Sequence, residues 1–333
     1  MSRILDKNDC GVSQLIASKN QWAIDLWRKG CANNWMPQEI DMSQDIKQWK
    51  QKDFISKDEK LLVKRTLGLF AMGESLVSNS IDTVEYRYLT DGALRQYLLR
   101  KNYEESLHNW TVAVCCEAYS LDVNEVAEAY KNIPSIKKKD DFIMRRLGTF
   151  DKDFDITTKE SKRLFLKNMV TFYLIVEGTW FFSNFALIMS LGRQNKLIGL
   201  YDQINYTVRD ETCHVEFGIN VINQIKDEYP GVWTKKLEKE LIEIVEEGVE
   251  IEIEYAKDIL PNGILGVNAG MLEDYIKFLA NQRVLAVNLP PVYEESKNPF
   301  TWLGEAQDAQ GMSAFFERRE KNYQHSGMLE DDF

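Results

Sequence analysis

Histidine is scarce in this chain of 333 residues, which contains only His108, His214 and His325. Proline is scarce too, with seven residues and none between Pro134 and Pro230. Because proline breaks a helix interior, that stretch can hold long uninterrupted helices. Basic residues are outnumbered, 41 against 52 acidic ones, which gives a formal net charge of −11. A general nucleic-acid binder normally has a basic surface, so we expect no nucleic-acid partner.

Other absences narrow the class of protein further. The five cysteines are an odd number without a CxxC pair, and no signal peptide opens the chain, so we expect a cytoplasmic protein without a disulfide framework. No uninterrupted apolar run reaches the length of a membrane span, so we expect no membrane contact. No GxxxxGK or GxGxxG phosphate loop is present, and the chain need not bind a nucleotide itself.

The sequence does contain strong helical periodicity. Apolar residues recur at helical spacing over long segments, at approximately 57–88, 92–121, 159–192, 195–226, 233–260 and 267–286. Ser56 and Glu59 form a capping-box pattern before the first segment, and Asn262-Gly263 marks a break before the last. Alternation typical of strands is scarce. We therefore predict an all-α fold with one helical domain over residues 1–310.

Two of the three histidines close the same pattern, Glu105-x-x-His108 and Glu211-x-x-His214. Residues three apart lie on one face of a helix, so each pattern presents a carboxylate and an imidazole together. Two such pairs, with one inward glutamate from each of two further helices, are the ligand set of a carboxylate-bridged dimetal site in a four-helix bundle. The patterns therefore predict a dinuclear metal centre.

Glu74 and Glu177 can supply the two further carboxylates. Each is a single carboxylate in a largely apolar helical stretch, where a buried charge is costly unless it is paired or bound to metal. Four glutamates and two imidazoles are donors that suit iron or manganese. Glu104 also lies one turn from His108 and competes as a ligand, but the shared Glu-x-x-His offset favours Glu105.

Four motifs carry a resemblance to a known family. They are Asn33-Asn34-Trp35-Met36-Pro37-Gln38-Glu39-Ile40, Glu74-Ser75-Leu76-Val77, Arg95-Gln96-Tyr97 with Glu105-Ser106-Leu107-His108, and Arg209-Asp210-Glu211-Thr212-Cys213-His214. Together they resemble the small, radical-generating subunit of class I ribonucleotide reductase, from about residue 20 to the tail. The resemblance implies a ferritin-like four-helix bundle core within the larger helical domain. It also implies six metal ligands: Glu74, Glu105, His108, Glu177, Glu211 and His214.

The same resemblance implies roles outside the ligand set. Trp35 and Asp210 match links of a radical-transfer route, in which Asp210 bridges His108 to Trp35. Tyr323 matches the residue that relays the radical to the catalytic subunit. Tyr206 matches a tyrosine that chlamydial-type proteins are proposed to use when an extra electron is needed during activation.

The chain end, residues 311–333, is polar and finishes with an acidic segment that has hydrophobic residues at its ends. It resembles the flexible tail with which small subunits dock on their partner. The partners that the resemblance implies are the large catalytic subunit, bound through this tail, and a second copy of the chain in a homodimer.

One position departs from the family pattern. Ordinary class I small subunits hold a stable radical on a tyrosine one turn after the first ligating histidine, and here that residue is Val112. The oxidising equivalent could reside on the metals, as in chlamydial-type manganese–iron proteins and a dimanganese branch, or on a displaced residue such as Tyr119 or Tyr173. A third option is an R2-like ligand-binding oxidase, which crosslinks a valine to a tyrosine. Val77 matches that valine, but Phe172 stands where the tyrosine should be, so we favour storage on the metals.

The resemblance thus implies the small subunit of a ribonucleoside-diphosphate reductase. Its dimetal centre would be activated by oxygen or by superoxide, and the large subunit would use the oxidising equivalent to reduce ribonucleotides to deoxyribonucleotides. We expect a manganese–iron pair first, a dimanganese pair close behind and a di-iron pair third. The alternatives are an R2-like Mn/Fe oxidase with a lipid-like ligand and a ferritin-like iron store.

Overall fold

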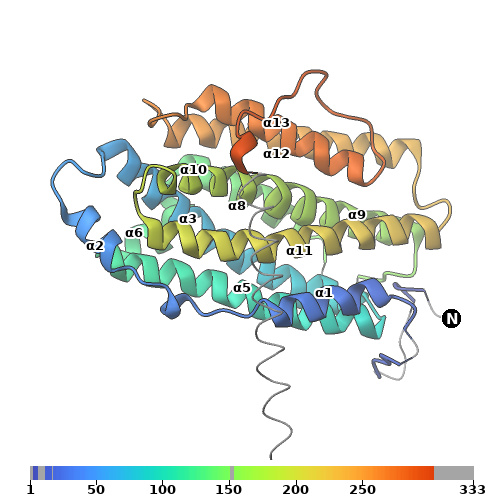
Figure 1. Cartoon of the computed structure of the whole chain (residues 1–333). Coiled ribbons are helices and arrows are strands. Elements are labelled where there is room, and N and C mark those ends of the chain that lie inside the picture. The colour runs from blue at the N-terminus through green and yellow to red at the C-terminus, as the bar shows by residue number, and fades with distance from the viewer. Residues whose placement is uncertain (1–2, 7–11, 17, 151–153, 304–333) are drawn as a thin grey trace, which may run out of the picture. The chain divides into compact units, whose positions relative to one another are not determined.

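The computed structural model describes residues 3–6, 12–16, 18–150 and 154–303, and these residues are mainly helical (Figure 1). No strand occurs among them, only an isolated bridge between Ile264 and Val267, so the predicted all-α class is confirmed. In chain order the elements are α1 (Gln21–Ala32), η1 (Pro37–Glu39), α2 (Ser43–Lys50), α3 (Lys57–Ser80), η2 (Ile81–Glu85), α4 (Tyr86–Tyr88), α5 (Gly92–Tyr119), α6 (Val123–Ala127), α7 (Ala129–Asn132), α8 (Pro134–Leu147), α9 (Lys159–Met169), η3 (Val170–Phe181), α10 (Phe182–Gly192), α11 (Ile198–Glu228), α12 (Lys235–Ile259) and α13 (Ala269–Ala286).

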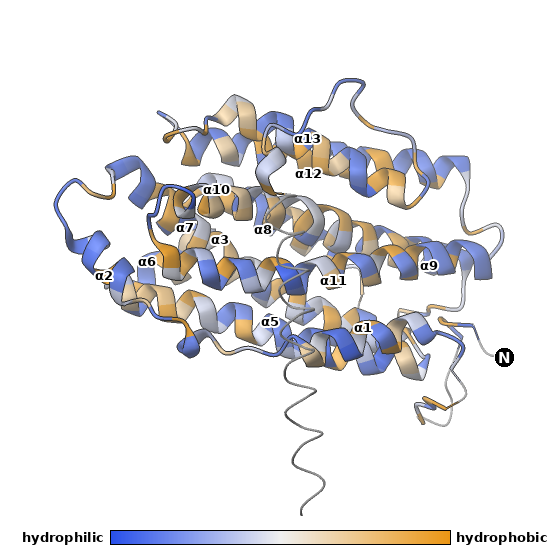
Figure 2. Cartoon of the chain, in the orientation of Figure 1, coloured by the Kyte–Doolittle hydropathy of each residue, from blue (hydrophilic) through white to orange (hydrophobic). Residues whose placement is uncertain are grey.

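Four long helical stretches form the core. They are α3, α5, α11 and the continuous stretch of α9, η3 and α10, and each of them packs against its neighbours in the bundle. Figure 1 shows α5 and α11 running side by side, with α12 and α13 along another side of the bundle. Hydrophobic and hydrophilic residues alternate around α5, α11 and α12, as expected when one face of a helix is buried (Figure 2). The helices α12 and α13 both pack on η3, so this segment is enclosed on every side.

The long helices begin and end where the sequence signals them. Ser56 accepts a hydrogen bond from the backbone N–H of Glu59, and the Glu59 carboxylate accepts one from the backbone of Ser56, which completes the predicted capping box. At the start of α5, the side chain of Asp91 accepts hydrogen bonds from the backbone N–H groups of Ala93 and Leu94. Gly263 has φ of +70°, a conformation that favours glycine, at the predicted break between α12 and α13.

The short helices were not predicted. The periodicity did not indicate α1, α2 or the region of α6, α7 and α8. For α2, α6 and α7, at most about two helical turns give too few repeats to define an apolar face, whereas α1 (12 residues) and α8 (14 residues) are long enough and were missed. Pro134 occupies the first position of α8, where its missing N–H costs nothing. That proline was a usable signal for a helix start.

One helical stretch, Lys159–Gly192, is long and apolar enough to cross a membrane by length and composition. Its most apolar window is wholly buried inside the protein, and Glu177 interrupts it. A completely enclosed core helix has the same composition, because it touches apolar neighbours on all faces.

The described residues up to Lys297 belong to one compact unit, and residues 298–303 belong to a second unit. The second unit is described only as far as Leu303 and contains a short helical turn at 301–303. The predicted boundary at residue 310, the tail at 311–333 and Tyr323 lie outside the described residues and stay predictions.

Candidate metal centre

Each of the four core stretches contributes a carboxylate to one point in the bundle. These side chains and two imidazoles are at most 2% exposed. The residues, in chain order, are Glu74 of α3, Glu105 and His108 of α5, Glu177 of η3, and Glu211 and His214 of α11. The structure thus brings all six predicted ligands into one buried cluster.

The cluster divides into two groups of potential ligand atoms. Within each group the atoms lie no more than 4.8 Å apart. We call the first group position 1, and it consists of Glu74, Glu105, His108 and Glu211. We call the second group position 2, and it consists of Glu105, Glu177 and His214.

Glu105 and Glu211 lie between the two positions. In Glu105, Oε2 is 3.8 Å from Nδ1 of His108, and Oε1 is 3.2 Å from Nδ1 of His214. In Glu211, Oε1 is 3.2 Å from Nδ1 of His108, and Oε2 is 3.3 Å from Nδ1 of His214. Each carboxylate therefore presents one oxygen to each side, which is the arrangement of a bridging ligand.

The polar atoms at the centre of the cluster lack ordinary partners. No hydrogen bond among the described residues reaches Nδ1 of His108 or His214, either oxygen of Glu105 or Glu211, Oε2 of Glu74 or Oε2 of Glu177. Buried polar atoms nearly always have a partner, so this many orphaned donors and acceptors need another explanation. Oxygen-rich donors with one imidazole per position suit manganese or iron. The residues present therefore fit a dinuclear metal site.

Desolvation and neighbouring charges shift the titration of these groups. Burial raises the pKa of Glu74 well above its usual value and raises the pKa of Glu177 to about 8. Burial acts in the same direction on Glu105, but Lys101 and His214 outweigh it and hold its pKa well below the usual range. Burial opposes a charge on His214, yet the nearby carboxylates raise its pKa well above the usual value. Without a cation, the cluster retains protons that metal binding would displace.

A carboxylate lies behind each imidazole. Nε2 of His108 is 3.5 Å from Oδ2 of Asp210, and Nε2 of His214 is 2.9 Å from Oε2 of Glu104. Such carboxylates orient a ligating imidazole and increase its basicity. The Asp210 contact was predicted, but the Glu104 contact was not. The signal was present, because an acidic residue directly precedes the glutamate of both Glu-x-x-His patterns.

Contacts continue from Asp210 to the surface. Nε1 of Trp35 donates a hydrogen bond of 2.7 Å to Oδ2 of Asp210. The Trp35 ring stacks on Tyr206 with a centroid distance of 5.2 Å, and Tyr206 is 38% exposed. The guanidinium of Arg209 lies 4.9 Å from the centre of the Tyr206 ring. The structure thus brings Trp35 and Asp210, predicted links of the radical route, and Tyr206, the tyrosine predicted for electron delivery during activation, together next to His108.

The contacts behind His214 are chemically different. Oε1 of Glu104 accepts a hydrogen bond of 2.8 Å from Nε of Arg100. The guanidinium of Arg100 lies 4.9 Å from the centre of the Tyr103 ring. An arginine is permanently charged and interrupts any series of oxidisable side chains between Glu104 and Tyr103. Among the residues that the structure describes, only the His108 side of the cluster has an indole in the corresponding place.

Lys101 is a cluster residue that the sequence interpretation missed. It is fully buried, with Nζ 2.7 Å from Oε1 of Glu177 and 3.2 Å from Oε1 of Glu105. Its ammonium also lies 4.9 Å from the ring centre of Tyr173, whose hydroxyl donates a hydrogen bond to Glu85. The spacing of Lys101 and Glu105, one helical turn apart, was the available signal.

Three residues bear on the alternatives to the missing radical tyrosine. Val112 is buried one turn after His108 and supplies no phenol. Tyr119 lies at the end of α5, about 16 Å along the helix from His108. Its hydroxyl donates a hydrogen bond of 2.8 Å to Asp45. Phe172, at the position of the oxidase crosslink tyrosine, is fully buried.

Two π-helical segments border the cluster. Glu177 lies within η3, and η2 continues directly from α3 and ends at Glu85. A π-helical turn holds more residues than an α-helical turn and is found frequently at functional sites. We predicted one continuous helix over 159–192 and missed this geometry. Every residue of η3 is buried, so no apolar stripe was available to reveal the helical period.

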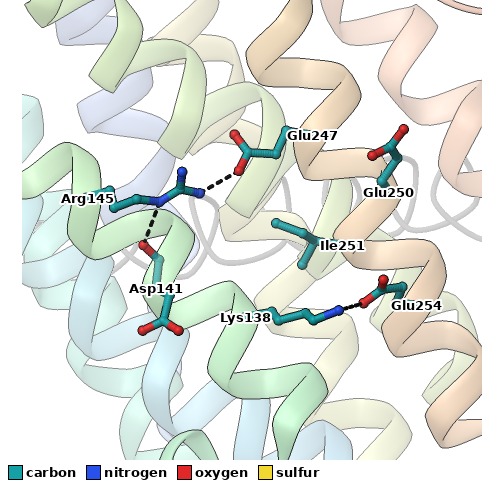
Figure 3. A pocket seen from close by; sticks show the side chains of 7 residues that line it. All are labelled: Lys138, Asp141, Arg145, Glu247, Glu250, Ile251 and Glu254. Carbon is teal, nitrogen blue, oxygen red and sulfur yellow. Dashed lines mark hydrogen bonds and ion pairs between the residues drawn. The ribbon is translucent and has the colours of Figure 1, made fainter.

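A separate surface groove of about 300 Å³ lies between α8 and α12 (Figure 3). Ion pairs between Lys138 and Glu254 and between Arg145 and Glu247 connect the two helices across it. Its lining residues are Lys138, Asp141, Arg145, Glu247, Glu250, Ile251 and Glu254. None of the six cluster residues lines this groove, and exposed ion pairs of this kind add little to stability.

Comparisons with known proteins agree with the geometry. Residues 13–299 match the family described as ribonucleotide reductase, small chain. The chain is 43% identical to the ribonucleoside-diphosphate reductase subunit beta of Chlamydia pneumoniae, over 98% of this chain and 94% of the relative. It is 29% identical to the subunit beta of Halalkalibacterium halodurans, over 91% of this chain and 86% of the relative.

Solved structures show the same fold. The ribonucleotide reductase R2 subunit from Clostridium botulinum superposes with a TM-score of 0.84 at 26% identity, over 91% of this chain and 93% of that one. The dimanganese(II)-NrdF of Streptococcus sanguinis shares the fold with a TM-score of 0.72 at 18% identity, over 86% and 95%. From the family match and the close relative, this chain belongs to the family of ribonucleotide reductase small chains.

Proposed function

We propose that this chain is the beta subunit of a ribonucleoside-diphosphate reductase and supplies an oxidising equivalent to a separate large catalytic subunit. One observation carries the proposal: contacts run without a break from His108 through Asp210 and Trp35 to the partly exposed Tyr206. An iron store needs no such route. An oxidase that acts on a ligand in its own core does not need a route to the surface either.

In the proposed route, one side chain would lose the electron and another would accept the proton. When bound, two redox-active metal ions would supply a one-electron oxidant at the cluster. Trp35 is the oxidisable side chain that hydrogen bonds to the carboxylate behind His108. Loss of an electron makes an indole N–H strongly acidic, and Asp210 is positioned to accept that proton. Tyr206, stacked on Trp35, would pass electrons between the surface and the indole.

The type of metal pair is part of the proposal. Val112 leaves no phenol one turn after His108, which favours an oxidising equivalent held on the metals. Manganese–iron is our first expectation, followed by dimanganese and di-iron, with activation by oxygen or superoxide. Raw affinity rarely decides between manganese and iron, so loading conditions must be tested directly.

Membership of the family supports a proposal for the partners of this chain. We propose that the chain works as a homodimer and docks on the large subunit through residues 311–333. A cytoplasmic location fits the four free cysteines among the described residues, Cys31, Cys115, Cys116 and Cys213.

Reductase activity with the cognate large subunit tests the proposed function. The metal-free chain would be loaded with manganese plus iron, iron alone or manganese alone, and each sample exposed to oxygen or superoxide. Activity that requires manganese would support a reductase subunit that stores its oxidant on the metals. Absence of activity with every loading, despite a complex demonstrated by sedimentation, would contradict the proposal.

Replacement of Tyr323 by phenylalanine tests the relay. A phenyl ring packs like tyrosine but cannot lose a proton and an electron, so we expect at least a hundredfold loss of reductase activity with unchanged metal content. Tyr103→Phe is the matched control, since Tyr103 is 41% exposed and lies beside Arg100, which pairs with Glu104 on the other side of the cluster. Full activity of the Tyr323→Phe protein would rule out this relay.

A further inference from the structure

Positive charge is distributed unequally around the two metal positions. At position 2, the Lys101 ammonium contacts both Glu177 and Glu105. A more distant arginine lies behind each position: Arg100 pairs with Glu104, the partner of His214, and Arg209 pairs with Asp210, the partner of His108. Lys101 is what makes the two positions differ, because no lysine or arginine within the described part of the chain forms an ion pair with Glu74 or Glu211.

Lys101 also limits what Glu177 can offer. Oε1 of Glu177 accepts a hydrogen bond of 2.7 Å from Nζ of Lys101, whereas Oε2 has no hydrogen-bond partner. This hydrogen bond uses one lone pair of Oε1, so Oε2 is the better oxygen of Glu177 for a cation. Glu74 has no such cation beside it, and its Oε2 is unpartnered.

The ammonium is held firmly in place. Lys101 is fully buried beside the Tyr173 ring, and the Tyr173 hydroxyl is fixed by Glu85. The ion pairs of Nζ with Glu177 and Glu105 hold the ammonium between these two carboxylates.

We infer that Lys101 makes the two metal positions unequal, so that position 1 binds a divalent cation first and more tightly and position 2 fills second. The inference rests on the dimetal site of the proposed function and adds an order of loading to it. Two effects act together. The ammonium repels a divalent cation at position 2 more strongly than at position 1, and its hydrogen bond competes with the cation for electron density on Glu177. Ordered filling is what a protein needs if it is to place two different metals in one cluster.

Manganese(II) titration of the metal-free full chain tests this inference. Calorimetry would give the two dissociation constants, and electron paramagnetic resonance would separate single ions from magnetically coupled pairs. For the wild-type chain we expect two equivalents with well-separated affinities, and an uncoupled signal up to the first equivalent. For Lys101→Met we expect the ratio of the two constants to shrink about tenfold, with coupled pairs already present at one equivalent.

Lys139→Met is the matched control. Lys139 is also fully buried, pairs with Glu252 and lies beside the Trp180 and Tyr255 rings, but it contacts none of the six cluster residues. It should lose stability like the Lys101 variant while it keeps the wild-type ratio of affinities. Lys101→Gln is the second variant, because glutamine can still donate to Glu177 without a charge. Lys101→Gln should also reduce the ratio of the two manganese dissociation constants if charge is the dominant effect.

Two ligand variants assign the positions. Glu177→Gln should keep the tightly bound first manganese ion, and Glu74→Gln should lose it. The reverse result, or an unchanged ratio in both Lys101 variants while the wild-type chain binds two ions, would overturn the inference and leave the proposed function intact. A wild-type chain that binds fewer than two ions would instead overturn the dimetal site and the inference with it.

Discussion

At the scale of single residues, each imidazole of the cluster is held between metal-facing carboxylates and one carboxylate behind it. Asp210 lies behind His108, and Glu104 lies behind His214. Replacing either carboxylate with its amide keeps the shape but removes the charge that favours the correct tautomer of the ring. We expect Asp210→Asn and Glu104→Gln each to weaken manganese binding by roughly 10- to 100-fold.

Direct titration with manganese measures this loss. Glu117→Gln is a suitable control, since Glu117 is an exposed carboxylate on α5, the helix of His108. It should bind metal like the wild-type chain. Wild-type affinity in both amide variants would show that the rings are held by other contacts.

The site residues differ in how well the sequence predicts them. The two Glu-x-x-His patterns and the isolated Glu74 and Glu177 are local signals, and the structure places them together. Lys101 gave no comparable signal, because a lysine on a helix is usually exposed and its main partner, Glu177, is 76 residues away. Only the folded chain shows that this lysine faces inward.

At the scale of elements, η3 fits into the bundle because its neighbours provide glycines. A Cβ at Gly218 of α11 would overlap the Tyr173 ring, and one at Gly248 of α12 would overlap Ile175. Gly218→Ala must therefore displace Tyr173, which lies beside Lys101. We expect a loss of about 1–3 kcal/mol in the free energy of unfolding, as for other overpacked cores.

Denaturant unfolding of the Gly218→Ala chain tests this packing. Gly270→Ala, at an exposed position near the start of α13, is the comparison and should change stability little. Equal stabilities of the two variants would mean that α11 and η3 can separate without cost.

The helices themselves were predictable to different degrees. The long amphipathic helices agree with the predicted ranges, because many turns of apolar periodicity define a face. The π-helical geometry of η3 was not predictable in this way. Every residue of η3 is buried, and an enclosed segment has no polar face to show its period.

At the scale of the whole molecule, the candidate metal centre lies where the core helices meet. Its six proposed ligands come from α3, α5, η3 and α11, so two bound ions would link all four stretches of the bundle. Without ions, four carboxylates and two imidazoles share one buried space, and burial raises the pKa of Glu74 well above its usual value. Metal binding should therefore stabilise the fold as well as prepare it for chemistry.

Removal of the metals should lower the melting temperature by a calculable amount. An ion present at a hundred times its dissociation constant stabilises the folded state by about 2.7 kcal/mol. Unfolding entropy of about 2.1 cal/mol/K per residue gives roughly 0.7 kcal/mol/K for a chain of this length, so each ion should shift the melting temperature by about 4 °C. Calorimetry of loaded and chelated protein measures the shift. Glu211→Gln loses a charge shared by both positions, so most of the shift in melting temperature should disappear in this variant. A shift equal to that of the wild-type chain would place the stabilising ions elsewhere in the molecule.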